Sequence, residues 1–253
     1  MVSIKFLGTG GGRFVTITQK RATGGFYIDA GKAKLYVDPG PGALVHAIKE
    51  RIPLRKLDAI FVSHAHIDHI NDAQVLIEAL TNGCTKKNGI FIGSISAVED
   101  LDEYHKSYLE KIVPLKPGEK FEFKNITLKA TKALHTDATT IGFVLDIKGK
   151  TIGYTSDSVF FNGFAEQFKG CDLIIINCIA YINPFKNLGV EKAKHMDMYD
   201  VIKFLKIAQP KLAVLNHYGM NMLKAGPENV AKLIEKQTGI KTKAIKDFEQ
   251  IEI

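Results

Sequence analysis

Four side chains that can bind a metal ion lie within six residues of this chain, where His64, His66, Asp68 and His69 form the pattern HxHxDH. Imidazole nitrogens and carboxylate oxygens are common ligands of zinc and similar divalent cations. The apolar, branched run AIFV at 59–62 directly precedes the motif and is typical of a buried strand. Crowding four such groups into one turn is unfavourable unless a cation or hydrogen bonds compensate them. The motif therefore predicts a metal site at the end of a strand.

An HxHxDH motif after a strand resembles that of the metallo-β-lactamase superfamily, and the likeness covers essentially the whole chain, starting from FLGTGGG at 6–12. Three later residues match the order of the family's ligands. His135, in ALHTD, is similar to its third histidine; Asp157, in YTSDS, to its metal-bridging aspartate; and His217, in VLNHYG, to its last histidine. The resemblance therefore implies a site assembled from distant parts of the chain.

The family scheme implies two metal ions in each chain. The ligands of the first ion would be His64, His66 and His135, those of the second Asp68, His69 and His217, with Asp157 bridging the two. In this scheme a hydroxide shared by the ions is the nucleophile, and Asp68 orients the attacking water. Zinc is the expected metal, and manganese and iron are alternatives that the same ligands accept.

His195 indicates a branch of the family. It lies in KAKHMDMYDVIKFL, just before a stretch with helical spacing. Branches resembling ribonuclease Z and the phosphoribosyl cyclic phosphodiesterase carry an additional histidine there, which contacts phosphate and protonates or stabilises the leaving oxygen. We therefore predict a phosphodiesterase that acts on a cyclic phosphate or a nucleotide-containing phosphodiester, with Asp68 and His195 as catalytic residues.

Other functions stay open on the same metal site. One is tRNA 3′-processing of the ribonuclease Z type, although residues 163–194 hold little spare length for a tRNA-gripping arm. Another is hydrolysis of a thioester or lactone. A non-catalytic metal- or ligand-binding protein is disfavoured because no expected ligand is missing. The cysteine-rich zinc knuckle of the cyclic phosphodiesterase is also not found in the sequence.

Some residues around the motifs have supporting roles in this interpretation. Asp38, in VDPGPG, is a candidate acceptor for a metal-bound histidine. The glycines of GTGGGR permit tight turns and a close approach of the backbone. Tyr181, Phe185 and Lys186 lie in a loop that can line the substrate entrance, and the pair at 86–87 can attract an anion.

Composition and charge indicate which partners and which cellular location to expect. The chain has 253 residues, a net charge of +7 and three cysteines without a CxxC pair. The positive charge suits a small anionic ester, or RNA, as partner. The cysteines are expected to be buried free thiols. No apolar run of about 18 residues and no signal peptide are found, so we expect a cytoplasmic protein without a membrane partner. Family habit favours a homodimer.

The hydrophobic pattern predicts one domain, residues 1–253. Strands are expected at 2–8, 24–30, 32–38, 59–64, 120–125, 126–133, 140–149, 150–157, 173–177 and 211–216, with a short strand pair at the end of the chain. Helices are expected after 41–42, at 72–83, after a cap at Asp197, and around Val230, Leu233 and Ile234. Two halves each deliver a histidine from an apolar strand, IFVSH and AVLNH. This favours two packed sheets with outer helices, and the resemblance implies an α/β fold, the four-layer αββα sandwich with two mixed β-sheets.

Overall fold

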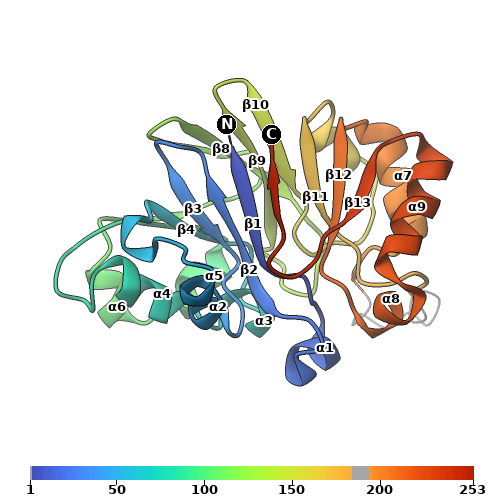
Figure 1. Ribbon diagram of the computed structural model, residues 1–253. Coiled ribbons are helices and arrows are strands. Elements are labelled where there is room, and N and C mark those ends of the chain that lie inside the picture. The colour runs from blue at the N-terminus through green and yellow to red at the C-terminus, as the bar shows by residue number, and fades with distance from the viewer. Residues whose placement is uncertain (1, 184–193) are drawn as a thin grey trace.

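Two seven-stranded sheets pack face to face in the computed structural model, which describes residues 2–183 and 194–253 (Figure 1). The strands of the first sheet, in spatial order, are β14 (Gln250–Glu252), β1 (Ser3–Gly8), β2 (Thr23–Asp29), β3 (Lys34–Val37), β4 (Ala59–Val62), β5 (Ile90–Gly93) and β6 (Lys111–Pro114). Those of the second sheet are β13 (Thr242–Ala244), β12 (Leu212–Asn216), β11 (Leu173–Asn177), β10 (Lys150–Tyr154), β9 (Ile141–Ile147), β8 (Ile126–Lys132) and β7 (Lys120–Phe123).

Helices cover the outer face of each sheet, so the predicted αββα sandwich is confirmed (Figure 1). The first half carries α1 (Arg13–Thr18), α2 (Ala43–Lys49), η1 (Leu54–Lys56), α3 (Ile67–Ile70), α4 (Ala73–Leu80), α5 (Ile95–Asp100) and α6 (Glu103–Ser107). The second half carries η2 (Ala165–Phe168), α7 (Met198–Ala208), α8 (Met220–Ala225) and α9 (Pro227–Thr238). None of the helices in the described part of the chain combines the length and the apolar character that crossing a bilayer requires.

Three apolar clusters hold the four layers together. The central cluster lies between the sheets, where Phe61 of β4 meets Phe143 of β9 edge to face with ring centroids 4.9 Å apart. A second cluster packs β4 and its neighbours against α2 and α4, and a third packs β11 and β12 against α7 and α9. Each large side chain fully buried in such a core contributes about 1.5–3 kcal/mol of transfer free energy. The sandwich is therefore a rigid support for the loops at its edges.

The two sheets share one pattern of strand directions. From β14 to β3 and from β7 to β10 neighbouring strands are antiparallel; from β3 to β6 and from β10 to β13 they are parallel. The expected similarity of the halves is therefore present. The strands before the two histidines are not equivalent, however, because β4 is the first parallel neighbour in its sheet and β12 is the second.

Most expected strands and helices are found, with two corrections. The expected closing strand pair is wrong: β13 joins β12 in the second sheet, whereas β14 pairs with β1 in the first. Alternating apolar residues indicate that one face of a strand is buried, but they do not indicate which sheet the strand joins. The partners of β13 and β14 could therefore not be predicted from the sequence. Leu233 of α9 was expected on the buried face, yet it is 41% exposed while Val230 and Ile234 are buried.

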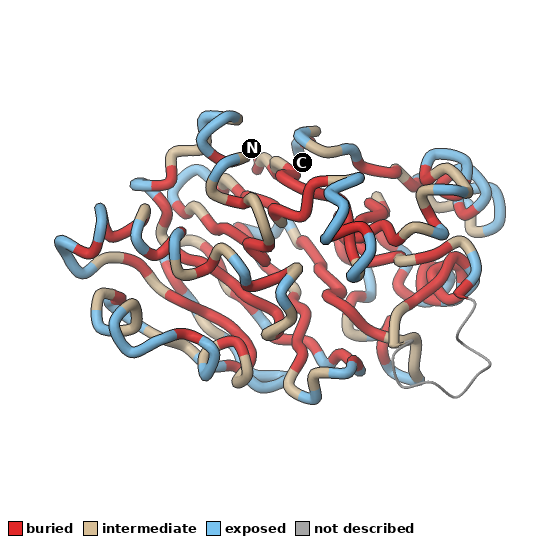
Figure 2. The backbone as a smooth tube through the Cα atoms, turned by 90° about the horizontal axis from the view of Figure 1, so that it is seen from below, coloured by how far each residue is buried: buried red, intermediate tan, exposed pale blue. Residues whose placement is uncertain are grey.

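Loops at one edge of the sandwich carry the predicted site residues. In Figure 1 this edge lies at the bottom, near α1, α3 and α8, and both chain ends lie at the top. Figure 2, seen from below, shows the strands buried along most of their length and the exposed residues gathered in turns and outer helices. The edge is formed by the carboxyl ends of β4, β10 and β12, where parallel strands place their following loops side by side.

Candidate metal centre

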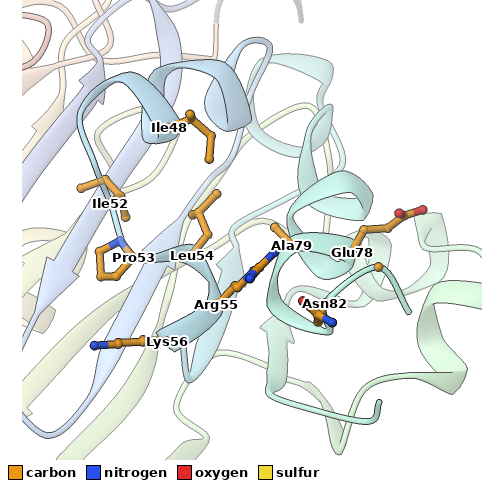
Figure 3. Close-up of a pocket in the computed structure, with 10 residues that line it drawn as sticks. Ile48, Ile52, Pro53, Leu54, Arg55, Lys56, Glu78, Ala79 and Asn82 are labelled. Atoms are coloured by element: carbon orange, nitrogen blue, oxygen red, sulfur yellow. The ribbon is translucent and has the colours of Figure 1, made fainter. Parts of the chain in front are cut away.

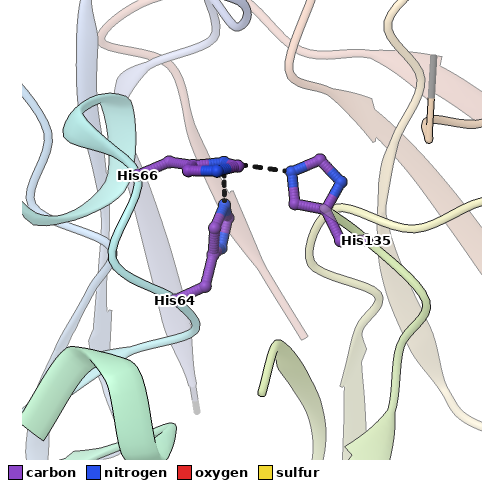
Figure 4. A group of neighbouring side chains, drawn as sticks. All are labelled: His64, His66 and His135. Atoms are coloured by element: carbon purple, nitrogen blue, oxygen red, sulfur yellow. Dashed lines mark hydrogen bonds between the residues drawn. The ribbon is translucent and has the colours of Figure 1, made fainter. Parts of the chain in front are cut away.

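Three histidine rings converge from the two halves of the molecule (Figure 4). His66 Nδ1 lies 3.0 Å from His64 Nε2 and 3.1 Å from His135 Nε2. His64 lies two residues after the end of β4, and His135 lies three residues after the end of β8 in the opposite sheet. One ligand atom from each ring therefore faces a common point, as the sequence predicted for the first metal ion.

A second group lies beside the first and contains Asp68, His69 and His217. Asp68 Oδ2 lies 3.9 Å from His69 Nε2 and 3.8 Å from His217 Nε2. Asp68 and His69 belong to the single-turn helix α3, and His217 directly follows β12 with a left-handed φ of 62°. This conformation costs a residue other than glycine of the order of 1–3 kcal/mol, a strain that is frequent at functional sites.

Asp157 lies between the two groups. Its Oδ2 atom is 3.2 Å from His217 Nε2, 3.3 Å from His69 Nε2 and 3.7–3.9 Å from the Nε2 atoms of His135 and His64. The Asn177 amide donates a 2.8 Å hydrogen bond to its other oxygen, Oδ1. Burial alone would raise the pKa of Asp157, but the surrounding histidines, led by His217, hold it well below its usual value. The carboxylate is therefore a shared, negatively charged centre.

His195 also reaches this cluster. Its Nδ1 atom lies 3.6 Å from Asp157 Oδ2, and its ring packs at 4.8 Å from that of His135 and stacks at 5.7 Å on that of His217, between ring centroids. The side chain remains 18% exposed. Burial lowers the pKa of His195 to about 3 against the opposing effect of Asp157. His195 is thus a neutral imidazole at the solvent-facing side of the centre.

The donor atoms fit metal ions. In His64, His69 and His135 the Nδ1 atom contacts Ser63 Oγ, Asp38 Oδ2 and the Lys194 carbonyl, so that Nε2 faces the cluster. Metal-binding histidines are oriented in this way in proteins. The buried Nε2 atoms of His69 and His217 have no hydrogen-bond partner of good geometry among the described residues. A cavity of about 20 Å³ beside Asp68, His69 and His217 has room for roughly one water-sized occupant.

Asp38 fixes the floor of the centre. At 3% exposure it receives hydrogen bonds from the Ser63 amide at 2.7 Å and the Tyr154 hydroxyl at 2.6 Å, besides its 2.8 Å contact with His69 Nδ1. Burial, together with Asp38, raises the pKa of Tyr154 well above its usual value, so this phenol donates. Burial alone would lower the pKa of His69, but the neighbouring carboxylates of Asp157, Asp38 and Asp68 raise it well above its usual value. The expected support of a histidine by Asp38 is therefore present.

The glycine-rich loop after β1 lies against the cluster. A Cβ atom on Gly11 would overlap the ring of His217, and the Gly12 amide donates a 3.0 Å hydrogen bond to Asp68 Oδ2. The close backbone approach expected of these glycines is therefore present. The loop thereby directs the positive end of the Gly12 N–H dipole at the Asp68 carboxylate, which belongs to the second group.

Asp137 was not singled out from the sequence. Its carboxylate accepts hydrogen bonds from the Ala65 amide at 3.2 Å, from Ser96 Oγ at 2.5 Å and from the Thr139 amide at 2.9 Å. It thereby connects the HxHxDH loop with the loop of His135. Its position two residues after a candidate ligand is the one sequence signal that could have identified it.

The remaining sequence candidates were expected to line the substrate entrance or to attract an anion. Tyr181 is half-buried nearby in the chain, whereas Phe185 and Lys186 lie outside the described residues. Lys86 and Lys87 are exposed in the turn after α4. A groove of about 700 Å³ opens between α2, η1 and α4, lined by apolar residues such as Ile48 and Leu54 (Figure 3). None of the clustered histidines lines this groove, so the groove is separate from the candidate metal centre.

Comparisons with known proteins agree with this picture. The model of the beta-lactamase superfamily domain matches residues 33–218. The uncharacterized protein MJ1374 of Methanocaldococcus jannaschii is 41% identical over 249 residues, covering 94% of this chain and 90% of that protein. The probable metallo-hydrolase YhfI of Bacillus subtilis is 26% identical over 213 residues, with 79% and 82% covered.

Solved structures show the same fold. The crystal structure of the metallo-beta-lactamase fold protein YhfI from Bacillus subtilis superposes with a TM-score of 0.82 at 22% identity, covering 100% of this chain and 99% of that one. Human tRNase Z, short form, gives a TM-score of 0.75 at 17% identity, with 99% of both chains covered. At these identities the structural likeness is a likeness of fold.

Proposed function

Since this chain belongs to the metallo-β-lactamase superfamily and is a metal-dependent hydrolase, we propose that it hydrolyses a phosphodiester bond. The proposed substrate is a cyclic phosphate or a small nucleotide-containing phosphodiester. The observation that carries the proposal is the place of His195, an additional imidazole within 3.6 Å of Asp157 beyond the seven expected ligands. The net charge of +7 adds a general attraction for anions.

The proposed ligand sets follow the two groups. His64, His66 and His135 would hold one ion, and Asp68, His69 and His217 the other, with Asp157 shared. Zinc is the proposed metal, because imidazole and carboxylate donors suit it. Two such ions would polarise a phosphoryl oxygen and make water acidic enough to act as a nucleophile near neutral pH.

The side chains of this protein would then direct the reaction. Asp68, held by the Gly12 amide at 3.0 Å, accepts a hydrogen bond from the attacking water and orients it. Water adds its oxygen to phosphorus, the bond from phosphorus to the leaving oxygen breaks, and that oxygen gains a proton. His195 stands at the solvent-facing side, where it contacts the phosphate and stabilises or protonates the leaving oxygen. A phosphate anion next to the ring favours the protonated imidazole and so opposes the effect of burial.

A tRNA 3′-end endonuclease is the second candidate, favoured by the fold likeness to human tRNase Z and by the positive charge. The little spare length found for an RNA-gripping arm in residues 163–194 weighs against it, because η2 and β11 already occupy 165–168 and 173–177. Cleavage of precursor tRNA by the purified protein would favour this candidate over a small substrate.

The test is hydrolysis of bis-p-nitrophenyl phosphate, with bound metal quantified, in the wild type and in His195→Ala. We expect turnover to fall about 10²–10⁴-fold, the usual contribution of a positioned acid or base, while two metal ions remain bound. His46→Ala is the matched control, since His46 packs on Phe248 and does not reach the cluster.

Three results would count against the proposal. Unchanged turnover in His195→Ala would remove the role of this residue, and loss of a metal ion would make it a ligand. A protein with two bound metals and no phosphodiesterase activity that hydrolyses thioesters or lactones would replace the substrate class.

A further inference from the structure

A second set of metal-ligand side chains lies away from the candidate metal centre, between α4 and α6. It consists of Glu78 near the end of α4, Cys84 in the following turn, and His105 in α6. One oxygen, one sulfur and one nitrogen atom of these residues all lie within 4.8 Å of one another. In Figure 1 α4 and α6 lie together at the outer side of the first sheet, away from α1 and α8.

His105 is oriented for metal binding. Its Nδ1 atom lies 2.8 Å from Asp102 Oδ2 and 2.9 Å from Asp102 Oδ1, and Oδ1 also accepts the backbone N–H of His105 at 2.8 Å. Because Asp102 accepts the Nδ1 proton, the neutral ring keeps its lone pair on Nε2. That atom faces Glu78 Oε1 at 3.4 Å. A carboxylate behind a histidine is the arrangement that commonly fixes a zinc ligand.

The spacing of the donors suits a small tetrahedral ion. Zinc–nitrogen and zinc–oxygen bonds of about 2.0–2.2 Å at the tetrahedral angle place neighbouring ligand atoms about 3.3–3.5 Å apart. The 3.4 Å between His105 Nε2 and Glu78 Oε1 already has this length. The Glu78 side chain is 48% exposed and free to adjust, while Cys84 is fixed at 7% exposure.

Cys84 distinguishes this set from the candidate metal centre. Its sulfur has a 3.7 Å contact with the Thr81 hydroxyl, and its amide donates to the same oxygen at 3.2 Å, so the turn holds the thiol in place. A sulfur, nitrogen and oxygen donor set selects zinc, cobalt(II) and similar ions over magnesium or calcium. The candidate metal centre, by contrast, offers only nitrogen and oxygen donors.

We propose that Glu78, Cys84 and His105 bind one further transition-metal ion, of the zinc class, which clamps α4 to α6. Binding displaces one proton from the Cys84 thiol to solvent, and water completes the coordination. The role of this ion is structural, because it fastens the outer helices over the first sheet. Glu78 also lines the groove between α2 and α4 (Figure 3). This proposal is independent of the proposed phosphodiesterase activity.

Cobalt(II) reports directly on this site, because only a thiolate ligand gives an intense sulfur-to-cobalt charge-transfer band in the near ultraviolet. We would titrate metal-free full-length protein with cobalt(II) and measure this band together with total bound metal. We expect the band to saturate at one equivalent in the wild type. It should vanish in Cys84→Ala and weaken at least tenfold in apparent affinity in His105→Ala, with one metal equivalent lost in each.

The controls separate a bound metal from a folding defect. Cys171→Ala removes another buried free thiol and should leave the band unchanged. Glu78→Gln, at a half-exposed side chain, keeps the fold and should lower cobalt affinity even where Cys84→Ala is unstable. A wild type without the band, or a band that forms with unchanged cobalt affinity in both His105→Ala and Glu78→Gln, would overturn the proposal. In that case His105 only contacts the carboxylates of Asp102 and Glu78.

Discussion

The two halves of the molecule supply their site residues in opposite ways. The first half delivers His64, His66, Asp68 and His69 from one loop after β4. The second half delivers His135, Asp157, His195 and His217 from four separate loops, and each depends on a different element. Local chain geometry positions the first set, whereas the packing of the second sheet and α7 positions the other. The second set should therefore be more sensitive to changes in its surroundings.

The sharpest test of this comparison is Asp157→Ala, because Asp157 contacts histidines from both halves. We expect loss of metal binding and a fall in kcat/KM of about 10³-fold or more, since metal ions contribute several kcal/mol to such reactions. Metal content and phosphodiester hydrolysis would be measured side by side. Asp146→Ala, at an exposed position of β9, is the control. Normal metal content in Asp157→Ala would contradict the assigned centre.

Gly11→Ala tests the contact between the halves. A methyl group there overlaps the His217 ring, so the ring must move. A misplacement of about 1 Å can cost roughly 10²-fold in rate. Gly31→Ala, where the added atom meets nothing within 4 Å, should keep its activity despite the positive φ of 73°. Equal activity of both variants would show that the ring has room to adjust.

Asp38→Asn tests the first half alone. An amide in place of the carboxylate turns a donor either towards His69 Nδ1 and the Tyr154 hydroxyl, which share Oδ2, or towards the Ser63 amide, which donates to Oδ1. Loss of such a supporting contact typically lowers metal affinity or activity about 10–100-fold. Binding isotherms would show the loss in one of two metal equivalents. Asp58→Asn, in the same half but remote from the centre, should bind both ions normally.

The smallest effect is expected at the end of the second sheet that lies away from the candidate metal centre, where Asp172 directly precedes β11. Asp172 accepts hydrogen bonds from Lys211 and the Thr151 amide, which lower its pKa from 3.8 to about 2. The contribution to stability is therefore present above pH 3.8 and is lost as the pH falls through about 2. In Asp172→Asn we expect unfolding free energy to drop by about 1 kcal/mol or less near pH 6. The difference from wild type should disappear towards pH 2, and hydrolysis should not change.

The same difference between the two halves determines how much of the site could be predicted from the sequence. The strand AIFV and the HxHxDH motif are local, so both the element and the ligand cluster could be read from sequence. His135, Asp157 and His217 were found through a family resemblance, because no spacing rule joins residues in separate loops. The structure then brought all of them within about 4 Å of Asp157 Oδ2 or of each other.

The misses have physical reasons. Asp137 contacts Ala65 across 72 positions, and Cys84 approaches His105 only because α4 and α6 pack together. The short helices α5 and α6 and strands β5 and β6 were not predicted, since four to six residues give little periodicity and no ligand motif follows them as HxHxDH follows the equally short β4. The pairing of β14 depends on a partner at the other end of the chain.

That last pairing has a consequence for the order of assembly. Asp247, just before β14, accepts hydrogen bonds from the Thr9 and Ala22 amides and so fastens the glycine-rich loop that approaches His217. A chain emerging from the ribosome makes its first histidine motif early, but the glycine-rich loop stays unfastened until Asp247 has been made. Contacts of such sequence separation form late and slowly. The loop beside the candidate metal centre is thus completed only by a residue far along the chain, and a chain truncated before Asp247 would carry the motif without this fastening.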